Sequence, residues 1–116
     1  MPDSHAVVVT VTWKTAPDTH RAIVTVRPQI VQVGPGDTIH FKRAGDAEGR
    51  MRITFKEKQC FETNNATGTF HEGEGDVRVK TMPRRMGYVC ELLDADGKPI
   101  PQSPPNAGGE TEPVKK

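Results

Sequence analysis

The chain has 116 residues, with 16 Lys and Arg against 15 Asp and Glu, ten prolines and eleven glycines. This length fits one domain that can bury a core without a metal or a disulfide. The even charge balance gives no support for non-specific binding to nucleic acid or to a membrane surface, and no apolar run reaches transmembrane length. Abundant proline and glycine favour a loop-rich β domain over a helical bundle.

The first third of the chain alternates between strand patterns and turn residues. In the stretch 6–13, AVVVTVTW, the period and the composition are typical of a β-strand. The stretch 14–21 carries Pro-Asp at its centre and predicts a turn. The run 22–33 predicts a second extended segment, in which Pro28 marks an edge or a break because proline cannot donate to a strand ladder. A tight turn is expected at 34–37, GPGD.

Two more strands and a long connection are expected in the middle of the chain. The stretch 38–43 directs Ile39 and Phe41 inward, and the stretch 50–56 alternates cleanly between apolar and polar residues. The stretch 57–76 has no sustained period and is too polar for a core helix. We expect it to be a long, partly ordered crossing loop.

The last part of the chain predicts two strands followed by a Pro/Gly-rich tail. The strands are expected at 77–81 and 88–93, with a turn at 82–87 between them. Because the stretch 98–116 is dense in proline and glycine, we expect it to be mobile or to supply one short last strand near 109–114.

About seven short strands with turns between them predict an all-β antiparallel sandwich or a small barrel. No window of helical length carries an apolar stripe, and the sequence contains no internal repeat. We expect the sandwich to occupy residues 6–97 and the tail to occupy residues 98–116.

Three stretches resemble the cupredoxin family of plastocyanin-like and azurin-like proteins. They are VRPQIVQVGPGDTIHF at 26–41, RMRITF at 50–55 and GYVC at 87–90. The resemblance covers roughly residues 22–97 and implies a Greek-key β-sandwich of about seven strands. It also implies a bacterial periplasmic or envelope location. An immunoglobulin-like sandwich, which shares short alternating strands, is the alternative fold.

The resemblance implies a copper site of two histidines, a cysteine thiolate and a weak axial ligand, but this chain retains only the cysteine, Cys90. In the family a histidine and then a methionine follow the cysteine. Here Glu91, Leu92 and Leu93 follow it, and no later residue is a histidine or a methionine. The first copper histidine of the family would fall near Met51. We therefore expect no blue copper site and no cofactor.

Three interpretations of Cys90 stay open. It fills the core as a small apolar side chain, or it pairs with Cys60. Such a disulfide would stabilise the fold by about 3 to 4 kcal/mol and would imply an oxidising compartment. The third interpretation is a non-standard Cu(I) site, because thiolate and thioether ligands are soft. Its candidate ligands are Cys90, Cys60, His71, Met82, Met86 and, as a further candidate, Met51.

Basic residues recur along two of the predicted strands. If these strands are neighbours, they form an anion-binding face able to hold phosphate or an acidic protein. An ordinary solvated surface is the other interpretation. No aromatic residue lies between these charges, so single-stranded nucleic acid is not expected as a partner. The residues of this face are Arg50, Arg52, Lys56, Arg78 and Lys80.

The sequence predicts a non-enzymatic protein. Its only serines, Ser4 and Ser103, lie in the terminal stretches, and a cysteine nucleophile would need a nearby histidine and an activated thiolate. The expected function is a small binding or structural module for a protein partner, acting as a monomer. The alternative is a copper-binding protein. The first residues lack the segments of a signal peptide, which leaves a cytosolic protein and a mature exported form both open.

Overall fold

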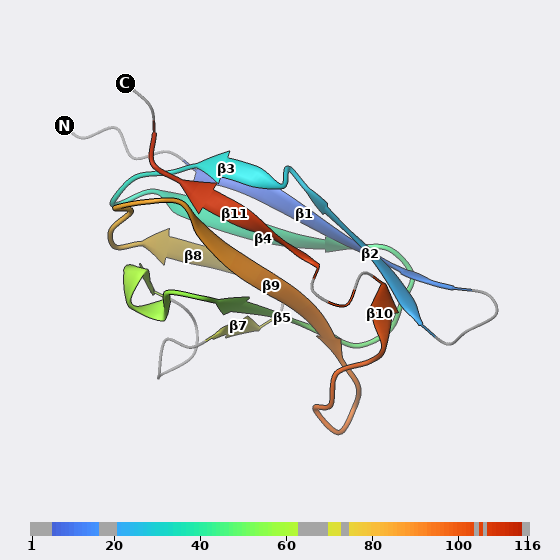
Figure 1. Cartoon of the computed structure of the whole chain (residues 1–116). Coiled ribbons are helices and arrows are strands. Elements are labelled where there is room, and N and C mark those ends of the chain that lie inside the picture. Colours follow the sequence, from blue (N-terminus) through green and yellow to red (C-terminus); the bar gives the residue numbers. More distant parts are fainter. Residues whose placement is uncertain are drawn as a thin grey trace.

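The computed structural model describes residues 6–16, 21–62, 70–72, 75–103, 105 and 107–114 (Figure 1). These residues form eleven strands and one short 3₁₀ turn, with no α-helix among them. The first five strands are β1 (Ala6–Thr15), β2 (Ala22–Arg27), β3 (Ile30–Gln32), β4 (Thr38–Ala44) and β5 (Arg50–Phe55). The later elements are η1 (Lys58–Cys60), β6 (Phe61–Glu62), β7 (Phe70–Glu72), β8 (Gly75–Val79), β9 (Met86–Leu93), β10 (Gln102–Ser103) and β11 (Gly108–Glu112).

The strands form two sheets that pack face to face (Figure 1). The six-stranded sheet has the order β10-β2-β1-β4-β8-β6, and the five-stranded sheet has the order β3-β11-β9-β5-β7. Both sheets are mixed, because β1 runs parallel to β4, β2 to β10 and β3 to β11. The all-β sandwich predicted from the sequence is confirmed, whereas the expectation of purely antiparallel pairing is wrong.

Aromatic rings join the two sheets across a single core. Alternate residues of β1, β2, β4, β5 and β9 are buried, as the period of two requires when one face of each sheet is covered. Phe41 of β4 meets Phe55 and Tyr88 edge-on, with ring centroids 6.2 and 5.4 Å away. Phe55 also stacks on Phe61 at 4.2 Å. These contacts fix which face of β5 and β9 points inward.

The chain passes from one sheet to the other at Pro28. Strand β2 belongs to the six-stranded sheet, β3 belongs to the five-stranded sheet, and the Arg27–Pro28 peptide bond between them is cis. The break predicted at this proline is confirmed. Strand β3 is three residues long and forms one edge of its sheet.

Two stretches carry more regular structure than the sequence pattern indicated. The stretch 57–76 contains η1, β6, β7 and the start of β8. The described residues 57–62 are held because Phe61 is buried in the core and β6 pairs with β8. The turn expected at 82–87 ends early, because β9 begins at Met86, whose side chain is buried.

The C-terminal part of the chain contributes to both sheets. Strand β10 pairs with β2, and β11 lies between β3 and β9 inside the five-stranded sheet. The short last strand expected near 109–114 corresponds to β11 at Gly108–Glu112. Its Thr111 is fully buried.

The loop between β4 and β5 closes tightly over Trp13. Gly45 in this loop has a φ of 95°, and a Cβ placed there would lie 2.0 Å from the carbonyl oxygen of Trp13. That oxygen accepts a hydrogen bond from the backbone N–H of Ala47 at 3.0 Å. The backbone of β1 therefore leaves no room for any side chain at residue 45.

We expect Gly45→Ala to lower the free energy of unfolding by clearly more than the matched variant Gly36→Ala. Gly36 has a similar φ of 89° but has open space around its Cβ position. The control should lose about 1–2 kcal/mol from backbone conformation alone, and Gly45→Ala should lose that amount plus the cost of the clash. Urea unfolding of both variants measures the difference, and equal losses would contradict the tight closure over Trp13.

Candidate functional site

Cys90 lies in the middle of β9 with its side chain in the core. It pairs with Ile53 of β5, and its side chain is fully buried. Its backbone N–H donates to the carbonyl of Ala107 at 2.7 Å, and its carbonyl accepts from Nε2 of Gln102 at 2.9 Å. Burial raises the pKa of the thiol to about 12. The group is therefore a neutral thiol at pH 7, whereas a metal ligand or a nucleophile must be a thiolate.

The disulfide between Cys60 and Cys90 is not formed, because both cysteines are free and buried. Cys60 ends η1 and leads into β6 of the six-stranded sheet, whereas Cys90 belongs to the five-stranded sheet. The carbonyl of Cys60 accepts the N–H of Lys80 at 2.8 Å. Burial and the carboxylate of Glu57 raise the pKa of the Cys60 thiol, against a lowering effect of Arg84. The interpretation of Cys60 and Cys90 as a disulfide, which the sequence left open, is therefore wrong, and the two residues are separate thiols.

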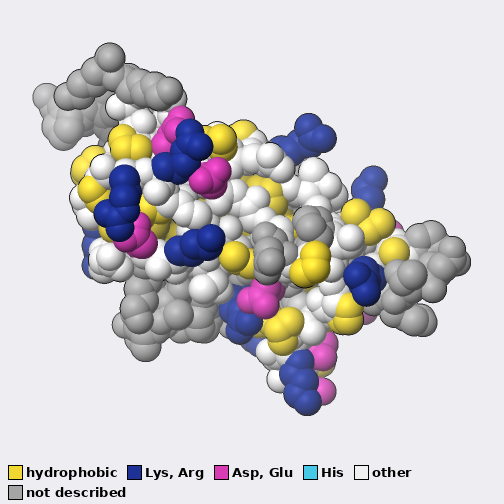
Figure 2. Space-filling model, viewed as in Figure 1, with side chains coloured by type: hydrophobic (Ala, Val, Ile, Leu, Met, Phe, Trp, Pro, Cys, Tyr) yellow, Lys and Arg dark blue, Asp and Glu magenta, His cyan; other side chains and the backbone are white. Residues whose placement is uncertain are grey.

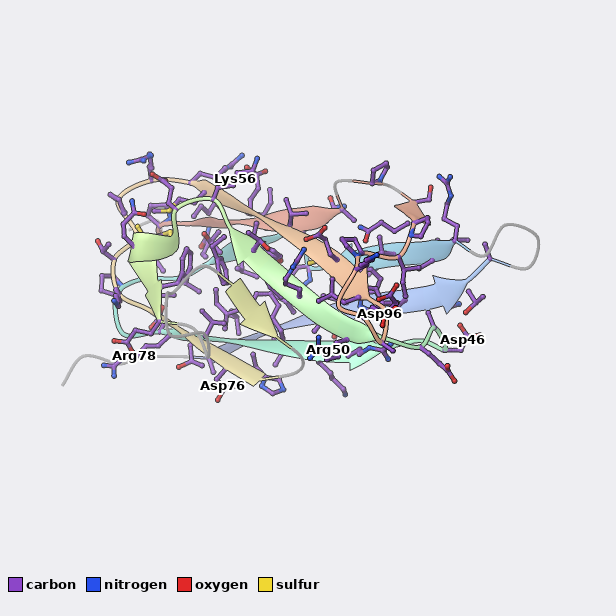
Figure 3. The ribbon with its side chains drawn as sticks, turned by 90° about the horizontal axis from the view of Figure 1, so that it is seen from below. Asp46, Arg50, Lys56, Asp76, Arg78 and Asp96 are labelled. Carbon is purple, nitrogen blue, oxygen red and sulfur yellow. The ribbon has the colours of Figure 1, made fainter. Side chains whose placement is uncertain are left out.

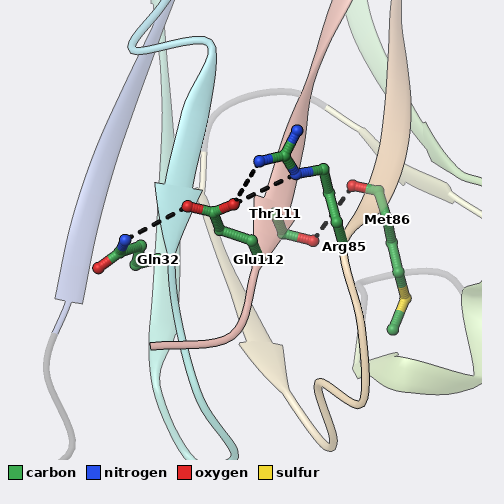
Figure 4. A network of polar contacts seen from close by, with 5 residues as sticks. All are labelled: Gln32, Arg85, Met86, Thr111 and Glu112. Carbon is green, nitrogen blue, oxygen red and sulfur yellow. Dashed lines mark hydrogen bonds and ion pairs between the residues drawn. The ribbon is translucent and has the colours of Figure 1, made fainter. Parts of the chain in front are cut away.

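The three methionines named as candidate ligands divide into two groups. Met82 and Met86 are both buried, and Oγ1 of Thr111 lies 3.5 Å from Sδ of Met82. The same hydroxyl donates to the backbone carbonyl of Met86 at 3.4 Å (Figure 4). Met51 pairs instead with Leu92, six residues further along β9 than Met86. At the rise of a strand this separation is about 20 Å. Met51 therefore cannot share one metal site with the other two.

The structure does not gather the remaining candidate ligands into one site. His71 pairs with Ile53 on the side opposite Cys90, which puts its backbone two strands away, about 10 Å at the spacing of strands. The side chain of His71 lies outside the described residues. Within the described ranges, no group of three His, Cys, Asp or Glu is placed to hold a metal ion.

The expected anion-binding face is not formed, because the two basic strands belong to different sheets. Strand β5 carries Arg50 and Arg52 and precedes Lys56, whereas β8 lies in the six-stranded sheet. Lys56 and Arg78 accordingly lie on opposite sides of the molecule (Figure 3).

The arginines of the outer surface are partly neutralised by acidic neighbours. Arg52 forms an ion pair with Glu91 at 2.8 Å, and Arg85 forms one with Glu112 at 2.7 Å. Glu112 also accepts a hydrogen bond from Nε2 of Gln32 (Figure 4). On the face drawn in Figure 2, basic and acidic side chains are interspersed. This pattern is typical of a solvated surface.

Sequence reasoning missed a hollow of about 630 Å³ on the outer face of the five-stranded sheet. Two glycines lie at diagonally neighbouring positions of β9 and β11 here. Gly87 pairs with Glu110, and Gly108 pairs with Val89, which is two residues further along β9. Lys56 lies on the other side of Gly87 and also lines the hollow. The signal available in the sequence was glycine inside a strand, which often marks a bulge or a close approach to another backbone or to a ligand.

A second hollow of about 550 Å³ lies at the end of the sandwich, between the β4–β5 loop and the turn after β9. Leu93 and Ile100 give it an apolar part, and Glu48 and Arg50 add charge. The carboxylate of Asp94 accepts the backbone N–H groups of two residues in the following turn, both at 2.9 Å. Asp94 therefore has a structural role in shaping this turn.

Comparison with models of known protein families gives no match, and comparison with curated proteins gives none. No helix in the described part of the chain is long and apolar enough to cross a membrane. The arguments about function therefore come from this chain's own residues.

The buried thiol of Cys90 predicts a loss of stability at alkaline pH. The folded state holds the proton up to a pKa of about 12, against an ordinary value of 9.0. The unfolded chain loses it first, so this contribution is complete below pH 9 and is lost as the pH rises from 9 to 12. The expected slope is at most about 1.4 kcal/mol per pH unit.

The measurement is the free energy of unfolding in urea at pH 8, 9 and 10. In Cys90→Ala, the part of the pH dependence of unfolding free energy that comes from the thiol should be absent. Val77→Ala, which also shortens a fully buried side chain, should keep the full pH dependence. Tyr88 adds its own decline only above about pH 10, because burial and Cys90 raise the pKa of its hydroxyl. Parallel curves for wild type and Cys90→Ala would show that the thiol does not carry the effect.

Proposed function

We propose that the chain is a cupredoxin-like Greek-key sandwich that lacks the blue copper site and acts as a small, non-enzymatic binding module. Two features support the cupredoxin-like part. A strand that ends before Pro28 leads through β3 and a turn into β4, whose Ile39 and Phe41 are buried, as the resemblance implies. The chain also alternates between the sheets, since β8 pairs with β4 and the next long strand, β9, pairs with β5. Such a path favours a Greek key.

The observation that carries the proposal is the position of Cys90. This residue is the one remaining member of the copper ligand set, and it lies between the sheets as a fully buried neutral thiol. The structure places its neighbour Ile53, and not a histidine, across the strand pair. A module without redox or catalytic chemistry then acts by binding at its surface. We propose a protein partner, a monomeric state and, following the resemblance, the bacterial envelope.

A Cu(I) site is the second candidate, and one observation favours it. Thr111 contacts the sulfur of Met82 and the backbone carbonyl of Met86, so these two buried methionines are near neighbours at one end of β9. Thioether sulfur is a soft ligand that selects Cu(I). Methionine side chains also fill irregular gaps in a core. A direct test is therefore needed to distinguish a Cu(I) site from ordinary core packing.

We expect no saturable binding when the reduced, ¹⁵N-labelled protein is titrated with Cu(I), Cu(II) and Zn(II) and followed by amide shifts. The reason is that the thiols are protonated and buried. Shifts confined to residues around Met82 and Met86, and absent from a Met82→Leu, Met86→Leu double variant, would replace the binding module by the Cu(I) site. Shifts centred on Cys90 would contradict both the buried thiol and the loss of copper chemistry.

A further inference from the structure

Strand β1 extends beyond one of the two strands that pair with it. Its pairing with β2 covers Thr10–Thr15, whereas its pairing with β4 covers Ala6–Thr12. The chain leaves the line of β2 at Pro28 and continues as β3 in the other sheet (Figure 1). Within the described residues, the stretch 6–9 of β1 therefore has a neighbouring strand on one side only.

The backbone groups at two positions of this stretch point to its open side. Just beyond the end of β1, Ala16 donates its backbone N–H to the carbonyl of Arg21 opposite it, at 2.9 Å. Because the residues of a strand bond alternately to its two sides, the even-numbered residues of β1 face the line of β2. The carbonyl of Trp13 bonds instead to the loop that follows β4. Ala6 and Val8 thus present their N–H and C=O groups to the side that β2 leaves open.

The side chains of β1 show that the core is incompletely covered at the same place. Val9 and Val11 are fully buried on the inward face of the strand. Val7 lies on the same face but is only partly buried, and Val8 on the outer face is 52% exposed. A strand placed beside the stretch 6–9 would cover Val7 and would pair the open backbone groups.

A cation stands at the upper end of this open side. Arg27 is the last residue of β2, is exposed, and points to the outer face of its sheet. Together with Val8, Thr10 and Pro28 it lines a hollow of about 820 Å³. Lys42 lies across Thr10 in the same row of the outer face. Within the described residues neither cation makes an ion pair, whereas the arginines that line the outer face of the other sheet pair with glutamates.

We propose that the open side of β1 binds an extended acidic segment of a partner protein as an added antiparallel strand, an inference that rests on the proposed function of a binding module. The added strand continues the line of β2 and exchanges backbone hydrogen bonds with Ala6 and Val8. Its inward side chains are apolar and cover Val7. An acidic side chain opposite Val8 points outward and lies two residues beyond Arg27 along this line, about 7 Å at the rise of a strand, where the two charges pair.

A second copy of the chain fits this edge less well than an acidic segment does. Antiparallel pairing of two such edges would set the stretch 6–9 of one molecule against the same stretch of the other. All four of its residues are apolar, AVVV, so Arg27 of either copy would gain no opposite charge. Charge complementarity therefore favours an acidic partner strand over self-pairing.

The first experiment titrates the ¹⁵N-labelled protein with a capped eight-residue peptide that alternates valine and glutamate. When extended, this peptide presents valine on one face and glutamate on the other. We expect saturable amide shifts at Ala6, Val8 and Thr10. A matched peptide with lysine in place of glutamate should bind more weakly by about tenfold or more, because Arg27 repels it.

Methylation of the peptide backbone tests whether the peptide adds as a strand. The N–H groups of alternate residues of a strand point to the same edge. In antiparallel addition the glutamate opposite Val8 exchanges hydrogen bonds with it, so a peptide N-methylated at its glutamates should lose binding. A peptide N-methylated at its valines should keep binding. Any other pattern would overturn the antiparallel strand.

Variants of the protein test the charge and the edge separately. Arg27→Glu should reverse the preference, so that the lysine peptide binds more tightly than the glutamate peptide. Arg78→Glu makes the same change in net charge on the same outer face, but on β8, which β4 separates from β1. It should leave the preference unchanged. Val8→Pro removes the N–H on the open side and leaves the bonds to β4, so it should keep the fold by circular dichroism and abolish peptide binding.

The results also separate this proposal from the function on which it rests. No saturable shift with the glutamate peptide, or an unchanged preference in Arg27→Glu, would overturn the docking edge. Dimers in analytical ultracentrifugation that Val8→Pro abolishes would assign the edge to a second copy and would equally overturn it. The binding module without copper would still stand on the metal titration. Metal binding at Cys90 or at the methionines would overturn the module itself, whatever the peptides do.

Discussion

The contact of Phe41 with Phe55 and Tyr88 is the interaction on which the arrangement of the five-stranded sheet depends. Because side chains alternate along a strand, placing Tyr88 inward also places Gly87 outward and Cys90 inward. A slip of one residue would move Cys90 to the surface and would put Gly87 in the core. The burial of the thiol and the open floor of the hollow thus follow from the same packing.

The inward-facing and outward-facing residues of β9 are consequently under different physical constraints. Inward residues are fixed by packing against a second sheet, where a missing methylene or an added one is costly. Outward residues are free of this constraint, and here glycine is found where a larger residue would strengthen the strand. Departures of this kind from local stability are expected where a surface has another role.

Sequence periodicity located the long strands because each has one buried face. The stretches 6–13, 38–43 and 50–56 correspond to β1, β4 and β5. Strands β6 and β7 were missed because two or three residues cannot display a period. The pairing of strands was equally hidden, since it depends on contacts between distant parts of the chain. For this reason the basic strands were treated as potential neighbours, and the hollow formed by β9 and β11 had no local signature.

The short edge formed by β3 has a consequence for self-association. An exposed edge presents unpaired backbone groups that can recruit another chain, and natural proteins limit this by short edge strands and by proline. Here the edge is three residues long, with Pro28 before it and Pro35 after it, neither of which can donate to a ladder. A second molecule could extend the sheet by only a few hydrogen bonds. The edge therefore opposes the growth of fibrils from stacked copies of the protein.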